Sequence, residues 1–200
     1  MGEIPKVATI FRQRLPLVAL SIVIALLSEM VFSAEQKAVV VVSQVGETIT
    51  VDAMMKVQVP VSTAWDVMTD FDHMTSILGN LTSSKVISRN GDIFIIRQKG
   101  SARYGFLSFP FESEREIRLE PMKRILARNL SGTLKRMDSE VYISSADQIV
   151  LINYHAEIVP DSFLARIFGA SFVRHEVEEQ LQRMADEMLR RYALNTPSGN

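Results

Sequence analysis

The sequence contains no cysteine among its 200 residues. Disulfide bonds, thiolate metal sites and cysteine nucleophiles are therefore excluded. Its three histidines, His73, His155 and His175, lie too far apart to give the spacing of a metal site. The sequence also lacks glycine-rich phosphate-binding motifs and the G-x-S-x-G motif of many hydrolases. Nucleotide binding, dinucleotide binding and this type of hydrolase chemistry therefore have no support.

An excess of charge of one sign is also missing. The 22 basic and 23 acidic residues give a formal net charge of -1 and are mixed along the chain. Because no basic stripe stands out, we do not expect a nucleic-acid partner. The hydrophobic fraction of 47% is enough for a buried core, and the length suits one domain plus a targeting segment.

The N-terminus has the order of a secretory signal. Lys6, Arg12 and Arg14 precede an apolar run over residues 15–27, and small residues follow near Ser33. This order predicts cleavage after Ser33 and export, into the periplasm of a bacterium. The alternative is an uncleaved membrane anchor, although the run is short for a span of about 20 residues. The predicted divisions are a signal or anchor at 1–33, a linker or frayed strand at 34–47, a domain at 48–194 and a tail at 195–200.

Alternating hydrophobicity predicts a half-buried strand over Ile49–Val59. Pro60 ends this strand, and Ser62 or Thr63 is positioned to cap the helix that follows. A second short helical turn is expected over Met74–Leu78. The segment thus predicts one strand followed by two short helices.

Six further strand-like segments follow, with short turns between them. Asn90-Gly91 is the dipeptide typical of a type I′ hairpin. Together with the first strand, these segments predict a seven-stranded antiparallel meander, and the β-prone run Val39–Val42 is a candidate for pairing with its edge. The expected strands cover residues 81–89, 92–101, 106–119, 124–131, 133–144 and 148–159.

One long helix is predicted near the end of the chain, from about Asp161 to Tyr192, with a bend at Gly169. Apolar residues recur there at intervals of three and four and form one stripe: Val173, Val177, Leu181, Met184 and Met188. Two i,i+4 ion pairs are expected on its solvent side: Glu179–Arg183 and Glu187–Arg191. A curved sheet packed around one helix usually leaves a cavity, which is the main functional indication in this sequence.

The segment Val57-x-Val-Pro-Val-Ser-x-x-Trp-Asp-Val-Met-Thr-Asp-Phe71 resembles the START/Bet v 1-like (SRPBCC) superfamily. It is most similar to the polyketide cyclase/dehydrase and coenzyme-Q-binding branch, and further matching features are Gly132, Tyr154, Pro160, and the helix with Gly169 and Glu176-Val177. The resemblance covers about residues 48–192. It implies an α+β helix-grip fold around a hydrophobic pocket, but no single activity, because the superfamily includes lipid carriers, hormone receptors and cyclases.

Four polar residues interrupt apolar strand faces and are candidate ligand contacts: Arg115, Tyr154, Gln98 and Asn129. A buried polar side chain needs a partner, and a buried arginine costs several kcal/mol unless it is paired. A ligand carbonyl, quinone oxygen or carboxylate could be that partner. Alternatively, Arg115 pairs with a neighbouring acid or extends past the sheet edge.

Apolar residues are expected to form the walls of the pocket. Phe109 and Phe111 share a strand face with Arg115, and Met184 and Met188 lie on the helical stripe. Methionine suits a pliable lining that tolerates varied ligands. The same bulky side chains could instead be ordinary core or fill the interior completely.

These observations predict an exported domain that binds a lipid, an isoprenoid quinone or a polyketide-like molecule, as a carrier or binding module without a cofactor. The mouth is expected near Asn80, Arg103–Gly105 and the start of the last helix. That helix start is unusually apolar and suggests transient membrane contact: Phe163, Leu164, Ile167, Phe168 and Phe172.

Two alternatives remain. A cyclase or dehydratase needs a titratable group inside the pocket, and the strands offer no inward Asp, Glu or His that we can assign; Asp70, Asp72 and His73 are expected at a solvated helix end. The other alternative is an interaction domain whose pocket is filled by its own side chains.

Overall fold

The computed structural model describes residues 37–104, 107–161 and 169–196. The predicted signal segment and the apolar residues between 162 and 168 lie outside the described residues. None of the helices in the described ranges is both long and apolar enough to cross a membrane.

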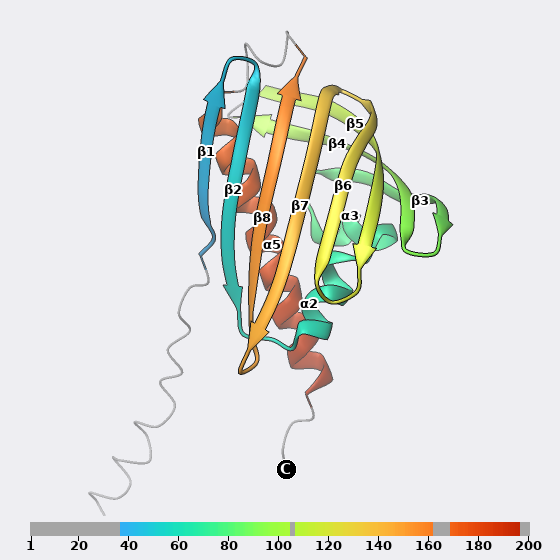
Figure 1. Ribbon diagram of the computed structural model, residues 1–200, viewed down its shortest axis with the longest axis vertical. Coiled ribbons are helices and arrows are strands. Elements are labelled where there is room, and N and C mark those ends of the chain that lie inside the picture. Colours follow the sequence, from blue (N-terminus) through green and yellow to red (C-terminus); the bar gives the residue numbers. More distant parts are fainter. Residues whose placement is uncertain (1–36, 105–106, 162–168, 197–200) are drawn as a thin grey trace, which may run out of the picture. The chain divides into compact units, whose positions relative to one another are not determined.

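The domain is built on one antiparallel sheet in the order β1-β2-β8-β7-β6-β5-β4-β3 (Figure 1). The first and last strands of the chain segment 48–160 are therefore neighbours, and β1 and β3 form the two edges. The strands are β1 (Val39–Val45), β2 (Thr48–Val57), β3 (Leu81–Asn90), β4 (Ile93–Tyr104), β5 (Leu107–Glu120), β6 (Arg124–Gly132), β7 (Leu134–Ala146) and β8 (Ile149–Pro160).

The predicted helix-grip α+β architecture is confirmed, with eight strands instead of seven. The additional strand is β1, which pairs with β2 in the register Val39↔Met54 to Val45↔Thr48. It falls within the segment expected to be a linker or frayed strand. The run of β-branched valines explains the difference, because such side chains favour the extended backbone and pack well against a neighbouring strand.

The alternating pattern of β2 places its apolar residues on the inner face, as predicted. Ile49, Val51 and Val57 are almost completely buried, whereas Asp52 and Lys56 between them are exposed. β8 lies beside β2 in the register Ile49↔Ile158 to Val57↔Val150. β2 thus lies between β1 and β8, with its apolar side chains in the core.

Positive backbone φ angles occur in the turns of several hairpins. The β3–β4 hairpin lies where the Asn90-Gly91 pair predicts one, but Gly91, at φ 59°, is the only residue of its turn with a positive φ, so the turn is not the expected type I′, which needs two. In the β7–β8 hairpin the positive angles occur at Asp147 and Gln148. The sequence therefore located both hairpins, but not the type of the first turn.

Short helices follow β2: α2 (Val61–Met68), the 3-10 turn η1 (Phe71–His73) and α3 (Met74–Ile77). The cap of α2 was predicted wrongly, because Pro60 occupies the N-cap and no side chain caps the helix. Proline is compatible with a helix start because its fixed φ suits the first turn. The buried face of α2 includes Ala64 and Trp65, as expected.

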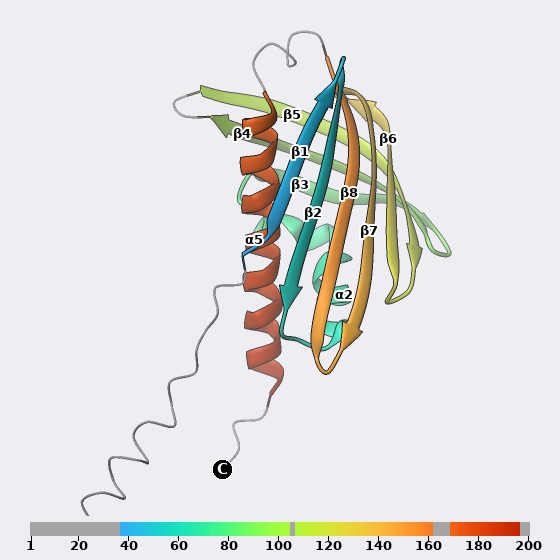
Figure 2. The same ribbon diagram turned by 60° about the vertical axis from the view of Figure 1, so that its left-hand side comes forward.

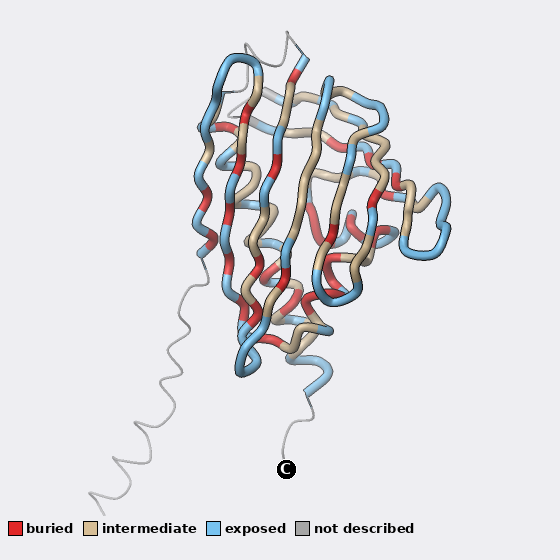
Figure 3. Tube along the Cα trace, in the orientation of Figure 1, coloured by how far each residue is buried: buried red, intermediate tan, exposed pale blue. Residues whose placement is uncertain are grey.

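The last described helix, α5 (Ala170–Asn195), runs along the inner side of the curved sheet (Figure 2). Gly169 is not a bend within it but its N-cap, since the Phe172 N–H donates to the Gly169 carbonyl oxygen at 3.0 Å. α5 packs against β1, β2 and α2. Buried segments gather on the faces that these elements turn toward one another (Figure 3), and the core continues up to the cavity described next.

Candidate ligand-binding site

A cavity of about 380 Å³ lies between the sheet and α5. Its lining comes from β4 to β8, from the segment that includes η1 and α3, and from the N-terminal half of α5. This volume lies in the range of ligand pockets, which begins at about 300 Å³. It argues against an interior filled by the domain's own phenylalanine and methionine side chains.

Seven of the eight predicted site residues line this cavity: Arg115, Tyr154, Gln98, Asn129, Phe109, Phe111 and Met184. Met188 does not, because it lies one turn further along α5 with no exposed surface. The helical stripe therefore contains both pocket wall and solid core. The change between the two occurs between Met184 and Met188.

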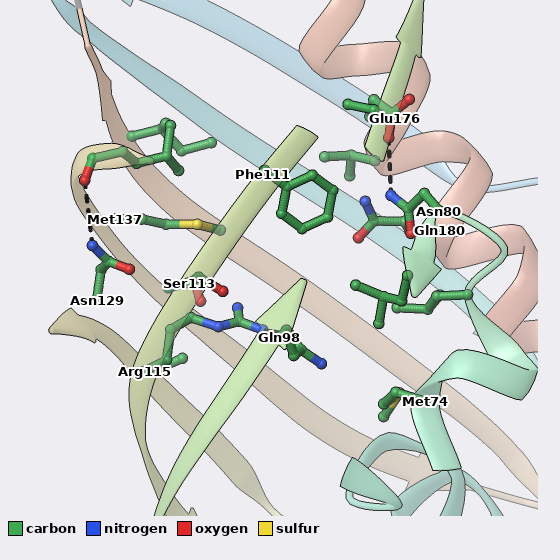
Figure 4. A pocket seen from close by; sticks show the side chains of 18 of the residues that line it. Met74, Asn80, Gln98, Phe111, Ser113, Arg115, Asn129, Met137, Glu176 and Gln180 are labelled. Carbon is green, nitrogen blue, oxygen red and sulfur yellow. Dashed lines mark hydrogen bonds between the residues drawn. The ribbon is translucent and has the colours of Figure 1, made fainter. Parts of the chain in front are cut away.

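Arg115 is held by a chain of hydrogen bonds that crosses three strands. Its Nη2 donates to Gln98 Oε1 at 2.6 Å, and the two side chains lie next to each other in Figure 4. Gln98 Nε2 donates to Ser84 Oγ at 3.0 Å. Ser84 Oγ in turn donates to the carbonyl oxygen of Phe71. Gln98 is 6% exposed, so it acts mainly to position the guanidinium.

Neither alternative for Arg115 holds among the described residues. It forms no ion pair with a described acid and does not extend past the sheet edge. The adjacent Glu114 and Glu116 point to the other face, where they pair with Arg97 and Arg128. Burial lowers the pKa of Arg115 from its usual value. Its Nε is buried and has no hydrogen-bond partner within the described part of the chain.

Tyr154 lies on β8, surrounded by protein but lining the cavity. Burial raises the pKa of its hydroxyl, while the positive charge of Arg115 and a hydrogen bond with Ser139 act in the opposite direction. The phenol therefore stays neutral at physiological pH and can both donate and accept a hydrogen bond. Arg115 and Tyr154 thus form a polar site inside an apolar cavity.

Asn129 lies where β6 and β7 separate. The last paired residues of these strands are Arg128 and Asp138, and beyond them Asn129 Nδ2 donates to the Leu134 carbonyl oxygen at 3.4 Å. This long bond spans the opening between the strands. The amide is thus partly committed to the fold, and its oxygen is the group left for a ligand.

The structure adds a titratable residue that sequence reasoning missed. Glu176 of α5 lines the cavity and accepts a hydrogen bond from Asn80 Nδ2 at 3.1 Å (Figure 4). Burial raises the pKa of its carboxyl, and hydrogen bonds from Asn80 and from the Arg103 backbone oppose that shift in part. The sequence analysis considered acids on the strands that point into the pocket, whereas Glu176 lies on the C-terminal helix.

Glu176 had a usable signal in the sequence. Phe172, Glu176 and Gln180 recur at intervals of four, in the row beside the apolar stripe, and all three line the cavity. A helical row that borders a buried stripe can turn inward where the helix faces a cavity. The periodicity alone cannot tell such a row from a solvated one.

A glycine allows the backbone to pass close to Asn80. A Cβ at Gly100 of β4 would collide with the Asn80 carbonyl oxygen and with the Phe111 ring. The Ser101 N–H donates to the same carbonyl oxygen at 2.8 Å. These contacts fix Asn80 at the cavity wall.

The remaining polar candidates lie outside the cavity. His155 and Asp52 pair at 2.8 Å on the outer face, and both are exposed. His73 pairs with Asp70 at 2.6 Å at the solvated end of α2, as expected. No group of three potential metal ligands occurs among the residues that the structure describes.

Comparison with known proteins agrees with this architecture. Residues 57–185 match the family described as polyketide cyclase / dehydrase and lipid transport. The chain belongs to this family. It thus falls in the START/Bet v 1-like superfamily that the strand–proline–helix segment resembles. No curated protein matches the sequence significantly.

Solved structures share the fold at low sequence identity. The Zhui aromatase/cyclase from Streptomyces sp. R1128 is 13% identical, with a TM-score of 0.61 over 76% of this chain and 99% of that one. The STAR-related lipid transfer protein from Xanthomonas axonopodis is 10% identical, with a TM-score of 0.57 over 78% and 95%. A START superfamily protein from Mycobacterium smegmatis is 12% identical, with a TM-score of 0.57 over 74% and 99%.

Proposed function

We propose that this domain binds a small apolar molecule that carries an oxygen-bearing group, and that it acts as a carrier or binding module. One observation carries the proposal: the cation Arg115 is enclosed by protein but partly exposed to an apolar cavity, and its hydrogen bond among the described residues goes to the neutral Gln98. A buried charge without a counter-charge is costly. A carbonyl, a quinone oxygen or a carboxylate of the ligand would reduce that cost.

The size of the cavity limits the ligand. The cavity of about 380 Å³ lies near the lower end of the range of ligand pockets, about 300–1,000 Å³, and so suits a small or medium-sized molecule. A medium-length acyl chain, a quinone head group or two fused aromatic rings fit this volume. Burial of their surface, at about 25 cal/mol per Å², supplies the driving force.

Titration of decanoate by calorimetry tests the proposal. The wild-type protein should bind it, and Arg115→Met should weaken binding by about 10-fold to 100-fold, because a hydrogen bond to a charged group is worth about 1.5–3 kcal/mol. Ala127→Phe, which places a ring in the cavity, should also reduce binding. Arg118→Met is the matched control, since Arg118 is exposed on the same strand outside the cavity. Absence of binding by the wild type, or equal losses in both arginine variants, would contradict the proposal.

A second candidate is a cyclase or dehydratase reaction, and Glu176 is the observation that favours it. A carboxyl with a raised pKa can transfer protons in the cavity where Arg115 could polarise a carbonyl. The test is deuterium exchange next to the keto group of a β-ketoacyl thioester in D₂O. Catalysed exchange that is lost in Glu176→Gln would support an enzyme, and exchange at the uncatalysed rate would reject it.

We also propose that the N-terminal segment directs export. The basic residues, apolar run and small-residue end at 1–33 support this reading. Mass analysis of protein expressed in a bacterium should find a chain in the periplasm that begins at Ala34. An intact chain in the membrane fraction would instead indicate the anchor.

A further inference from the structure

A second group of polar side chains lines the same cavity, apart from Arg115. Asn80 follows α3, while Glu176 and Gln180 lie one turn apart on α5. Figure 4 shows these three residues grouped together, away from the Arg115–Gln98 pair. The proposed binding function makes use of Arg115 and gives this second group no role in holding the ligand.

Hydrogen bonding leaves this group with spare acceptors. Asn80 donates to one oxygen of Glu176, and the Arg103 backbone N–H donates to the same carboxylate. Asn80 Oδ1 is buried and has no partner among the described residues. A buried acceptor without a donor is destabilising, so the described part of this site is short of a donor.

The charge of Glu176 is also uncompensated. It forms no ion pair with any residue in the described ranges. Two ionisable side chains of α5 that act on it electrostatically, His175 and Glu179, are exposed, and Glu179 is paired with Arg183 at 2.7 Å. From β4 it receives only the Arg103 backbone contact. Within the described part of the chain, the cavity wall thus carries a cation and, elsewhere, an acid, neither of which has an ion-pair partner.

We propose that Asn80 and Glu176 form a second polar subsite, which binds a hydroxyl group at the end of the ligand remote from Arg115. This inference rests on the proposed function and narrows it. The ligand is an apolar molecule with a carbonyl or carboxylate at one end and a hydrogen-bond donor at the other. A hydroxyl suits the site because it can donate to Asn80 Oδ1 or to the Glu176 carboxylate at a smaller desolvation cost than an ammonium group.

Paired probes that differ only by the terminal hydroxyl test this subsite. Decanoate is compared with 10-hydroxydecanoate, and dodecanoate with 12-hydroxydodecanoate, by calorimetry on the full domain. The measured quantity is the ratio of the affinity for the hydroxy acid to the affinity for its parent acid. This ratio should fall by about 10-fold or more in Glu176→Leu and in Asn80→Ala for at least one chain length.

Two further variants separate the subsite from effects on folding. Glu176→Gln keeps the shape and one acceptor, so its ratio should lie between those of the wild type and Glu176→Leu. Glu179→Gln changes a neighbouring exposed carboxylate on α5 and should leave the ratio unchanged. Because Asn80 lies outside the helices and strands, we expect Asn80→Ala to fold. This variant therefore still tests the subsite if Glu176→Leu does not fold.

The outcomes distinguish the two proposals. If the parent acids bind but the ratio is the same in all proteins at both chain lengths, the subsite is wrong and the proposed function stands. If the ratio falls equally in Glu179→Gln, the subsite is also wrong. If no probe binds the wild-type protein, the proposed function fails and the subsite fails with it.

Discussion

The two halves of α5 lie in different surroundings. In the C-terminal half, Ala185 and Met188 are completely buried, and Arg191 bonds to both Glu187 and Asp70 at 2.6 and 2.7 Å. The N-terminal half faces the cavity, and its Glu176 has no ion pair among the described residues. One helix thus packs in the core at one end and lines the cavity at the other.

The difference between the halves implies that stability and binding can be changed separately. A carboxylate with two arginine partners is stabilised by the fold, whereas a half-buried carboxylate without a cation is held at a cost. Costly polar groups that persist in a cavity are candidates for function. The C-terminal half therefore stabilises the fold, and the N-terminal half is the part that we propose contacts the ligand.

The largest expected difference in stability is between alanine variants of two methionines on the same apolar stripe of α5. Met188→Ala should lower the free energy of unfolding by about 2–5 kcal/mol, because it leaves a void in close-packed core. Met184→Ala should cost less, about 1–2 kcal/mol, because the side chain already borders a cavity. Urea unfolding at pH 7 measures both. Equal losses would show that the two halves are packed alike.

Acid should weaken the C-terminal half. Hydrogen bonds from Arg190 and Arg191 lower the pKa of Glu187 to about 2, despite partial burial. The unfolded chain binds this proton nearer pH 4.3, so the stabilisation is complete above that value and is lost as the pH falls toward 2. One such group can change the unfolding free energy by at most about 1.4 kcal/mol per pH unit. In Glu187→Gln, the free energy of unfolding should therefore fall less steeply between pH 5 and pH 2 than in the wild type. An unchanged pH dependence would contradict the pairing of Glu187 with the two arginines.

The smallest expected effect concerns Glu176, whose contribution to the unfolding free energy depends on pH in the opposite direction to that of Glu187. Burial raises the pKa of this carboxyl, so the folded state binds the proton more tightly than the unfolded chain. The resulting stabilisation is present below about pH 4.3 and is lost as the pH rises through the folded pKa. Glu176→Gln should therefore raise the unfolding free energy at pH 7, by less than about 1 kcal/mol because solvent screens the half-buried group. A loss of stability at pH 7 would show that the charge is favourably paired.

Much of the fold could be predicted because it depends on local pattern. The period-two alternation of Ile49–Val59, the Asn90-Gly91 turn and the spacing of Val173, Val177 and Leu181 each specify an element directly. The strand β1 was left open because a run of valines extends equally well as a linker or as an edge strand. Only the presence of β2 beside it decides between the two.

The candidate site was predictable only in part. Arg115 and Tyr154 were found because a polar residue on an apolar strand face is conspicuous under strict alternation. Glu176 was missed because a helix allows an intermediate row between its buried and solvated faces. Met184 and Met188 could not be separated, since they share one stripe and the curvature of the sheet decides which of them meets the cavity.

Native mass spectrometry of the protein purified from its own host tests the central claim most directly. The wild-type domain should retain an apolar molecule that is released on denaturation, and Ala127→Phe, purified in the same way, should retain much less. A wild-type protein of bare polypeptide mass, or equal retention by both proteins, would contradict a ligand bound between the sheet and α5.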